Sequence, residues 1–225
     1  MADQASLDAL SGMLAFVSRT PEAARLQARV LLEKYTTLER VLENSEELLG
    51  ESDGLGAIGA QLLCNIPALA RRLSADSLGE RPVIASLSAA RPLMDSLYLG
   101  KRQEELYLLA LNERCELTAV RQILRGTLCE VCLSARLIVE AVLETRAGRI
   151  ILCHNHPAGN PRFSMADVTT MRHFLPLMAR LGVPVVDHVL YADTKIRSMR
   201  AEGRIGEPVW AATGSGNISR ESWLR

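Results

Sequence analysis

The chain has 225 residues, of which 48% are hydrophobic, and its 26 Lys and Arg residues balance 26 Asp and Glu residues. This length suits a helical module plus a modest catalytic domain, and zero net charge argues against a dedicated nucleic-acid binder while leaving room for a local basic patch. No apolar run approaches the roughly 20 residues that span a bilayer, and the acidic start Met1-Ala2-Asp3-Gln4 is unlike a signal peptide, so we expect a cytoplasmic protein with no membrane partner.

The N-terminal part of the chain has apolar residues at helical spacing throughout. They recur every three to four residues between Leu7 and Val17, and similar clusters follow as far as about Leu73. This pattern predicts short helices that pack together as a helical module over residues 1–80.

A glycine-rich turn, Gly54-Leu55-Gly56, precedes an amphipathic helix in this module. Such a turn can offer backbone N–H groups to a phosphate, as hairpin turns between two helices do in DNA-binding modules. It can equally be a tight turn that needs glycine only for backbone freedom. We favour the second interpretation, because one such turn in a neutral chain binds DNA weakly at physiological salt, but DNA remains a candidate partner.

A mainly polar stretch separates this module from the rest of the chain. It runs from Ser74 to Glu80, and the spacing then predicts a helix from about Val83 to Leu97, interrupted by Pro92. We therefore expect residues 81–103 to form a linker helix between two domains.

Beyond this linker the hydrophobic period changes, which predicts a mixed α/β domain over residues 104–208. The expected strands cover residues 106–111, 116–124, 149–153 and 183–191, and the expected helices cover residues 134–145 and 165–181. The remaining residues, 209–225, are small and glycine-rich in part, so we expect a mobile tail.

The cysteines give no sign of a disulfide framework. They are odd in number and irregularly spaced, at Cys64, Cys115, Cys129, Cys132 and Cys153, which favours free thiols in a reducing compartment. Cys129 and Cys132 form a C-x-x-C pair, but a structural zinc site needs a second pair and none stands nearby.

The segment from His154 to Asp167 carries the clearest chemical signal. His154 and His156 stand two residues apart at a strand end, where side chains alternate with period two, so both can reach one ion. Asp167, in the first turn of an expected helix, can supply a third ligand and leave a tetrahedral ion one position for water. These ligand types suit Zn²⁺, and three protein ligands plus water are typical of a catalytic site.

Each of these residues also has a structural alternative. Ser164 and Asp167 fit a variant of the helix capping box, and residues 155–159 would by themselves form a turn. The joint pattern, in which two of four histidines share a strand end and a capped helix follows, favours a metal site.

The pattern His-x-His-Pro-x-Gly-x-x-x-x-Ser-x-x-Asp resembles the signature of the JAMM, or MPN-type, zinc metalloproteases. The His-Asn-His-Pro form is similar to the bacterial RadC family within that group. The resemblance covers about residues 104–203, and the helical N-terminus resembles the helix-hairpin-helix module of RadC proteins. It therefore implies a small helical N-terminal module followed by an α/β domain of the JAMM/MPN type.

The resemblance also implies roles for individual residues. Zinc would be held by His154, His156 and Asp167, and the hydroxyl of Ser164 would hydrogen-bond the oxyanion of a tetrahedral intermediate. Zinc lowers the pKa of bound water to about 7, which would support hydrolysis of a peptide or isopeptide bond in a peptide or protein substrate.

The family also uses a glutamate near the first strand of the domain as general acid and base. Glu104 matches this place best and Glu105 stands one residue away, so a strand would turn only one of them toward the metal. We favour Glu104, although the polar run around it would by itself indicate a solvated surface.

Asp187 and His188 match an Asp-His pair of RadC proteins, and Ser198 matches a later serine. They fit either partners that orient a ligand or an ordinary buried hydrogen-bonded pair. His173 lies six residues after Asp167, on another face of the helix, and is left out of the site.

The chain departs from the RadC pattern beside the site. It has Cys132-Leu133-Ser134-Ala135 where the family has His-Pro-Arg-Glu, and Ala158-Gly159-Asn160-Pro161 where the family has Ser-Gly-Asp-Pro. These changes spare the ligands but put substrate or partner recognition in doubt. Two functions stay open, a zinc-dependent hydrolase and a DNA-associated repair or recombination accessory protein with a latent metal site; a nuclease is a weaker third, because one metal lacks the paired clamp common in phosphodiester cleavage.

Overall fold

The computed structural model describes residues 3–44, 55–126 and 135–206. Gly54, the Cys129 and Cys132 pair, and the tail at 209–225 lie outside these ranges. The chain divides into two units: residues up to Leu73 with Leu99–Arg102, and Ser74–Tyr98 with the residues from Gln103 onward.

The first unit is helical, as predicted. Its helices are α1 (Gln4–Leu14), α2 (Pro21–Tyr35), α3 (Leu38–Glu43) and α4 (Gly56–Asp76). Side-chain oxygens cap the first three helices, each accepting a hydrogen bond from a backbone N–H three residues on; the caps are Asp3, Thr20 and Thr37. Their apolar faces meet in one core: Leu10, Leu14, Ala24, Ala28, Leu31, Leu32, Val41, Leu55, Ala60 and Leu63.

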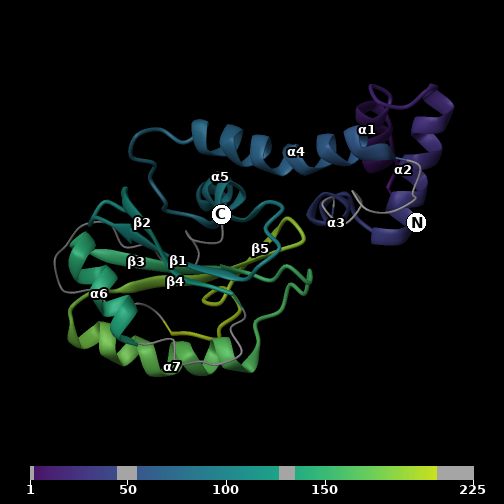
Figure 1. Ribbon diagram of the computed structural model, residues 1–225. Coiled ribbons are helices and arrows are strands. Elements are labelled where there is room, and N and C mark those ends of the chain that lie inside the picture. Colours follow the sequence, from purple (N-terminus) through teal and green to yellow (C-terminus); the bar gives the residue numbers. More distant parts are fainter. Residues whose placement is uncertain (1–2, 45–54, 127–134, 207–225) are drawn as a thin grey trace. The chain divides into compact units, whose positions relative to one another are not determined.

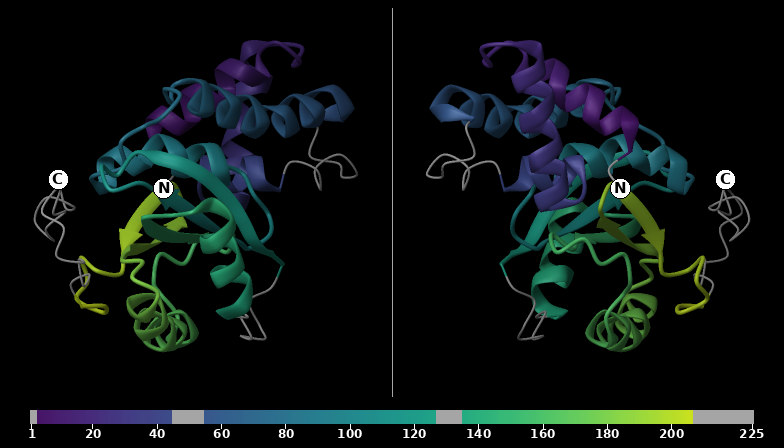
Figure 2. Two further views of the ribbon diagram at one scale, coloured as in Figure 1. Left: turned by 90° about the vertical axis from the view of Figure 1, so that its left-hand side faces the viewer. Right: turned by 90° about the vertical axis from the view of Figure 1, so that its right-hand side faces the viewer.

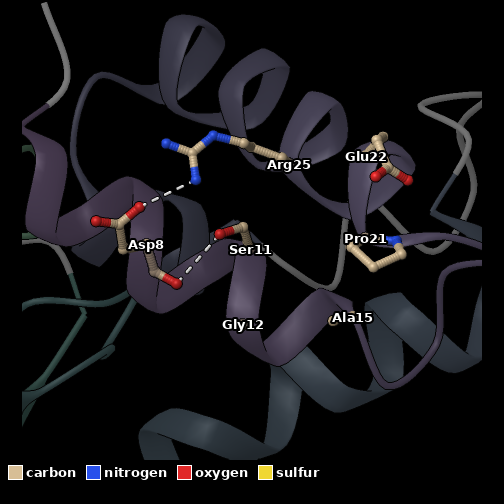
Figure 3. A pocket seen from close by; sticks show the side chains of 7 residues that line it. All are labelled: Asp8, Ser11, Gly12, Ala15, Pro21, Glu22 and Arg25. Carbon is tan, nitrogen blue, oxygen red and sulfur yellow. Dashed lines mark hydrogen bonds and ion pairs between the residues drawn. The ribbon is translucent and has the colours of Figure 1, made fainter.

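An open pocket lies between α1 and α2 (Figure 3). Its lining residues are Asp8, Ser11, Gly12, Ala15, Pro21, Glu22 and Arg25. An ion pair between Asp8 and Arg25 at 3.2 Å crosses it, and both side chains are about half exposed. Such an exposed pair stabilises the helices by little.

The second unit is built on a five-stranded mixed sheet in the order β2-β1-β3-β4-β5 (Figure 1). The strands are β1 (Glu105–Leu111), β2 (Leu117–Arg125), β3 (Arg149–Asn155), β4 (Val185–Ala192) and β5 (Lys195–Ser198). Only β3 and β4 pair in parallel; the other neighbouring pairs are antiparallel. The α/β fold class expected from the sequence is confirmed.

Helices cover both faces of this sheet (Figures 1 and 2). On one face, α6 (Ala135–Thr145) and α7 (Met165–Arg180) pack against Leu108, Leu152 and Leu190. On the opposite face, α5 (Leu87–Tyr98) packs against Leu109 and Ile151.

The segment predicted as a linker helix differs in the structure. The helix α5 begins four residues later than expected, because Val83 pairs as an isolated bridge with Glu116 and the hydroxyl of Ser86 accepts a hydrogen bond from Ala89 N at 3.1 Å. Met94 and Tyr98 are buried in the core between α5 and the sheet. Residues 84–98 are thus part of the sheet domain, since their apolar side chains fill one of its two cores.

The short strand β5 was not predicted. Its four residues, Lys195 to Ser198, are mostly polar and carry too little hydrophobic pattern to mark a strand. Asp193 and Thr194 form the preceding turn with φ of 54° and 55°, without the Asn-Gly or Asp-Gly pair that signals a hairpin. In the described ranges, no helix is both long and apolar enough to cross a membrane.

Candidate metal centre

The end of β3 carries the first two residues of the candidate site. This strand runs two residues further than predicted, to Asn155, and all seven of its residues are buried. The side chain of His154 is fully buried, and His156 follows directly, with its backbone N–H donating to Tyr191 O at 2.9 Å. Pairing with β4 therefore fixes the backbone that holds both histidines.

The first turn of α7 supplies the carboxylate. Ser164 and Asp167 form the predicted capping box: Asp167 N donates to Ser164 Oγ at 3.1 Å, and Ser164 N donates to Asp167 Oδ2 at 2.7 Å. The Ser164 hydroxyl also donates to Asp167 Oδ2, at 2.8 Å. One carboxylate oxygen is thus held by the cap, while Oδ1 lies 3.5 Å from His154 Nε2.

These contacts bear on the expected oxyanion role of Ser164. A hydroxyl has one proton to donate, and here the geometry directs that proton at Asp167. In this arrangement Ser164 orients a ligand, and it could donate to an oxyanion only by releasing Asp167 Oδ2.

The Nε2 atoms of His154 and His156 and the two carboxylate oxygens of Asp167 lie close to the spacing that a tetrahedral ion requires. A tetrahedral ion with bonds of about 2.0–2.2 Å separates its ligand atoms by about 3.3–3.6 Å. His154 Nε2 lies 3.1 Å from His156 Nε2 and 3.5 Å from Asp167 Oδ1, and His156 Nε2 lies 3.9 Å from Asp167 Oδ2. His154, His156 and Asp167 together form a group that could hold a metal ion.

The second nitrogen of each histidine is occupied, which leaves both Nε2 atoms for an ion. His156 Nδ1 lies 2.9 Å from the carbonyl oxygen of Asn160, which can only accept, so this nitrogen carries the proton. His154 Nδ1 lies 2.8 Å from His188 Nε2. A metal on His154 Nε2 places the proton on Nδ1, where His188 accepts it.

Burial, hydrogen bonds and nearby charges together set the protonation states of His188 and Asp167. Burial lowers the pKa of His188 to about 3, and the nearby His154 ring acts in the same direction, so His188 is neutral at physiological pH. Burial would raise the pKa of Asp167, but the hydrogen bond and the charge of His154, with the donors of Ser164, hold it well below its usual range. An ionised carboxylate suits a bound cation, and a neutral His188 can accept the proton on Nδ1 of His154.

The sheet register separates the two candidate glutamates. The pairing of β1 with β3 runs without irregularity from Leu106 opposite His154, so residues two apart on β1 share the face of His154. Glu105 lies on the other face, only 2% exposed, where it accepts a hydrogen bond from Tyr107 Oη at 2.8 Å and pairs with Arg125 at 3.5 Å.

Glu104 stands directly before β1 and is half-buried. Its carbonyl oxygen accepts from Gly126 N at 2.8 Å. Continuing the alternation of β1 by one residue places Glu104 on the face of His154. The register therefore favours Glu104 over Glu105 as the glutamate that faces the ligands.

The predicted pair of Asp187 and His188 divides into two roles. His188 contacts His154 through its ring, whereas the contact between Asp187 and His188 is to the backbone N–H of His188. The Asp187 carboxylate is fully buried and accepts hydrogen bonds from Ser198 Oγ, from His188 N at 2.7 Å and from Arg200 N at 2.9 Å. These hydrogen bonds therefore connect Asp187 on β4 to Ser198 at the end of β5 and to the turn that follows β5.

Two features of this region were not predicted from the sequence. Asn155, expected in a turn, is 2% exposed and hydrogen-bonds the segment around Glu104. Phe163 packs against the rings of His154 and His188, with centroids 6.1 and 5.7 Å away. Neither contact has a local signal, because each joins residues far apart in the chain. His173, which was left out of the predicted site, is exposed and hydrogen-bonds Thr169 O.

A mixed sheet between helices, with two histidines at a strand end and an aspartate in the next helix, defines a JAMM-type metal-dependent hydrolase fold. Comparison with known families matches residues 84–204 to the RadC-like JAB domain, and this match includes α5. The chain belongs to the RadC family.

Curated relatives agree over most of the chain. A UPF0758 protein of Delftia acidovorans is 32% identical over 199 residues, which cover 86% of this chain and 88% of the relative. UPF0758 proteins of Neisseria meningitidis serogroup C and Bordetella bronchiseptica are 29% and 30% identical over 177 and 175 residues, covering 78% of each chain. These names state no activity.

Proposed function

We propose that the protein is a zinc-dependent hydrolase of peptide or isopeptide bonds. One observation carries the proposal: His154, His156 and Asp167 lie close enough together to hold an ion. The alternation of β1, continued to Glu104, supports a place for that residue on the same face. The nitrogen and oxygen ligands suit Zn²⁺, and the expected reducing cytoplasm is compatible with the free thiols of Cys64, Cys115 and Cys153.

The residues of the chain divide the work of hydrolysis. Zinc, when bound, would lower the pKa of a water molecule to about 7 and polarise the scissile carbonyl. Glu104 would take a proton from the attacking water and return it to the leaving amine. Ser164 would keep Asp167 in place, and His188 would keep the proton of His154 on Nδ1.

The test begins with metal content and continues with matched glutamate variants. Elemental analysis of the purified protein should find one zinc per chain. A library of internally quenched peptides, supplemented with peptides joined through ε-lysyl isopeptide bonds, then serves as the probe. Glu104→Gln should reduce kcat on cleaved peptides by about 10²-fold or more, whereas Glu105→Gln should change kcat little because Glu105 lies on the opposite face. Absence of zinc, or full activity in Glu104→Gln, would contradict the proposal.

A second candidate function is DNA binding by the helical unit. One observation favours it: Gly56 opens α4 with φ of +67°, and among the described residues nothing lies within 4 Å of the position that a Cβ would take there. Backbone N–H groups at the start of α4 would then be accessible to a phosphate. Binding of single-stranded and branched DNA, measured at 50 and about 200 mM salt, tests it: no binding at low salt, or binding unchanged in Gly56→Ala, would exclude this function.

A further inference from the structure

The side chain of Asn155 spans both peptide groups that flank Glu104. Asn155 Oδ1 accepts a hydrogen bond from Glu105 N at 2.8 Å, and Asn155 Nδ2 donates one to Gln103 O at 3.1 Å. Asn155 stands between the two histidine ligands in sequence, at the end of β3. A single side chain therefore joins the strand that carries His154 and His156 to the segment that carries Glu104.

The chemistry of these two bonds demands an amide. Glu105 N can only donate and Gln103 O can only accept, so the bridging group must present one acceptor and one donor in a fixed plane. An Asn side chain does so in only one orientation. An aspartate would set oxygen against the Gln103 carbonyl, and alanine would lose both bonds.

The position of this contact gives it a consequence for the site. Glu104 precedes β1, and the regular pairing with β3 starts at Leu106. The backbone at Glu104 is held instead from its two sides, by Asn155 and by Gly126, whose N–H donates to Glu104 O. Loss of the Asn155 bonds would remove both of these contacts between this backbone and β3, and the position of Glu104 relative to His154 and His156 would be less well fixed.

We propose that Asn155 is a positioning residue that holds Glu104 at the distance from the metal ligands at which it can move a proton. This inference rests on the proposed function, in which Glu104 is the proton carrier. It assigns a role to the residue between the two histidines, which ligates nothing itself.

The test compares Asn155→Ala and Asn155→Asp with a matched control, Asn112→Ala. Asn112 lies just beyond the other end of β1 and likewise bonds the backbone, through Oδ1 to Arg114 N at 2.9 Å and Glu116 N at 3.0 Å. The probe is the quenched peptide that the wild-type protein cleaves fastest. Asn155→Ala should lower kcat by about 10- to 100-fold, as a misplaced catalytic group does, with KM and zinc stoichiometry unchanged. Asn155→Asp, which keeps the shape and one bond, should also lose activity.

A double-mutant cycle separates positioning from general support of the fold. If Asn155 acts through Glu104, adding Asn155→Ala to Glu104→Gln should cost no further activity beyond about threefold, so the two losses are strongly non-additive. Additive losses, loss of zinc in both Asn155 variants, or a kcat no lower than that of Asn112→Ala would overturn the proposal.

Amide hydrogen exchange distinguishes failure of this inference from failure of the proposed function. In Asn155→Ala the Glu105 amide should exchange at least about tenfold faster, while the Leu108 amide within the ladder keeps its protection. If the wild-type protein cleaves no peptide, the hydrolase proposal falls, and unchanged Glu105 exchange would separately show that Asn155 does not hold the segment.

Discussion

The rings of His154 and His188 meet across β3 and β4, with Nδ1 of His154 2.8 Å from Nε2 of His188. His188 is 4% exposed, and in the described part of the chain its own Nδ1 has no hydrogen-bond partner. The His188 ring therefore makes its hydrogen bond to His154, which would bind the metal through its other ring nitrogen, Nε2.

Replacing His188 should weaken metal binding without unfolding the protein. In His188→Phe the ring volume stays but the acceptor for His154 is lost, so zinc affinity should fall by about 10- to 100-fold. Competition with a chromogenic chelator measures this affinity. His173→Phe is the control, because that histidine is exposed on α7. Equal zinc affinity in the wild-type protein and His188→Phe would disprove the role of this contact.

Ser164→Ala should separate capping from oxyanion stabilisation. Loss of an N-cap costs about 1 kcal/mol of stability, and Asp167 also loses a hydrogen bond to Oδ2, so thermal stability and zinc affinity should both fall. If the hydroxyl only orients Asp167, saturating zinc should restore kcat to near the wild-type value. A kcat that stays about 10²-fold lower with zinc bound would instead support direct contact with the oxyanion.

The buried carboxylate of Asp187 predicts an unusual dependence of stability on pH. Burial raises the pKa of Asp187 from 3.8 to about 6, against the hydrogen bonds that it accepts. The folded protein therefore holds this proton more tightly than the unfolded chain, so the contribution of Asp187 to stability is greatest below pH 3.8 and is lost as pH rises through about 6. Relative to Asp187→Asn, the wild-type protein should lose about 2 kcal/mol between pH 4 and 7. Urea unfolding of both proteins across this range measures the difference, in which other titrating groups cancel; a flat difference would refute the shift.

The packing of α5 predicts where the chain can be shortened. A protein that begins at Ser74 keeps α5 over the core formed with β1, β3 and β4 and should fold and bind zinc. A protein that begins at Glu104 exposes this core and should aggregate. Met94→Ala in the full chain should cost about 2–5 kcal/mol, because Met94 is fully buried. Zinc binding and circular dichroism measure whether each of the two shortened proteins folds. If the protein that begins at Glu104 folds, α5 is dispensable for folding.

Local patterns were sufficient to predict the ligand group and most elements of the sheet domain. His154 lies at the end of β3 and His156 two residues on, just past it, and Ser164 and Asp167 share one helical turn, so their relations follow from strand and helix geometry. The family resemblance pointed to Glu104 or Glu105 and favoured Glu104, and the register of β1 against β3 adds a structural argument for the same residue.

Contacts across the sheet could not be predicted in this way. His188 touches His154 because β4 lies parallel to β3, and no spacing within one segment encodes that pairing. The same holds for α5: its helical spacing was visible, but a single chain does not reveal which surface buries an amphipathic helix.

The antiparallel pairing of β1 with β3 also bears on the order of folding. These strands are separated in the chain by β2 and α6, so their contact closes a long loop, which is slow and entropically costly. His154, His156 and Asp167 lie close together in the chain, whereas the segment that carries Glu104 joins β3 only after that closure. An incompletely folded chain could thus bind metal before it acquires its proton carrier, and a burst of metal binding that precedes activity during refolding would record this interval.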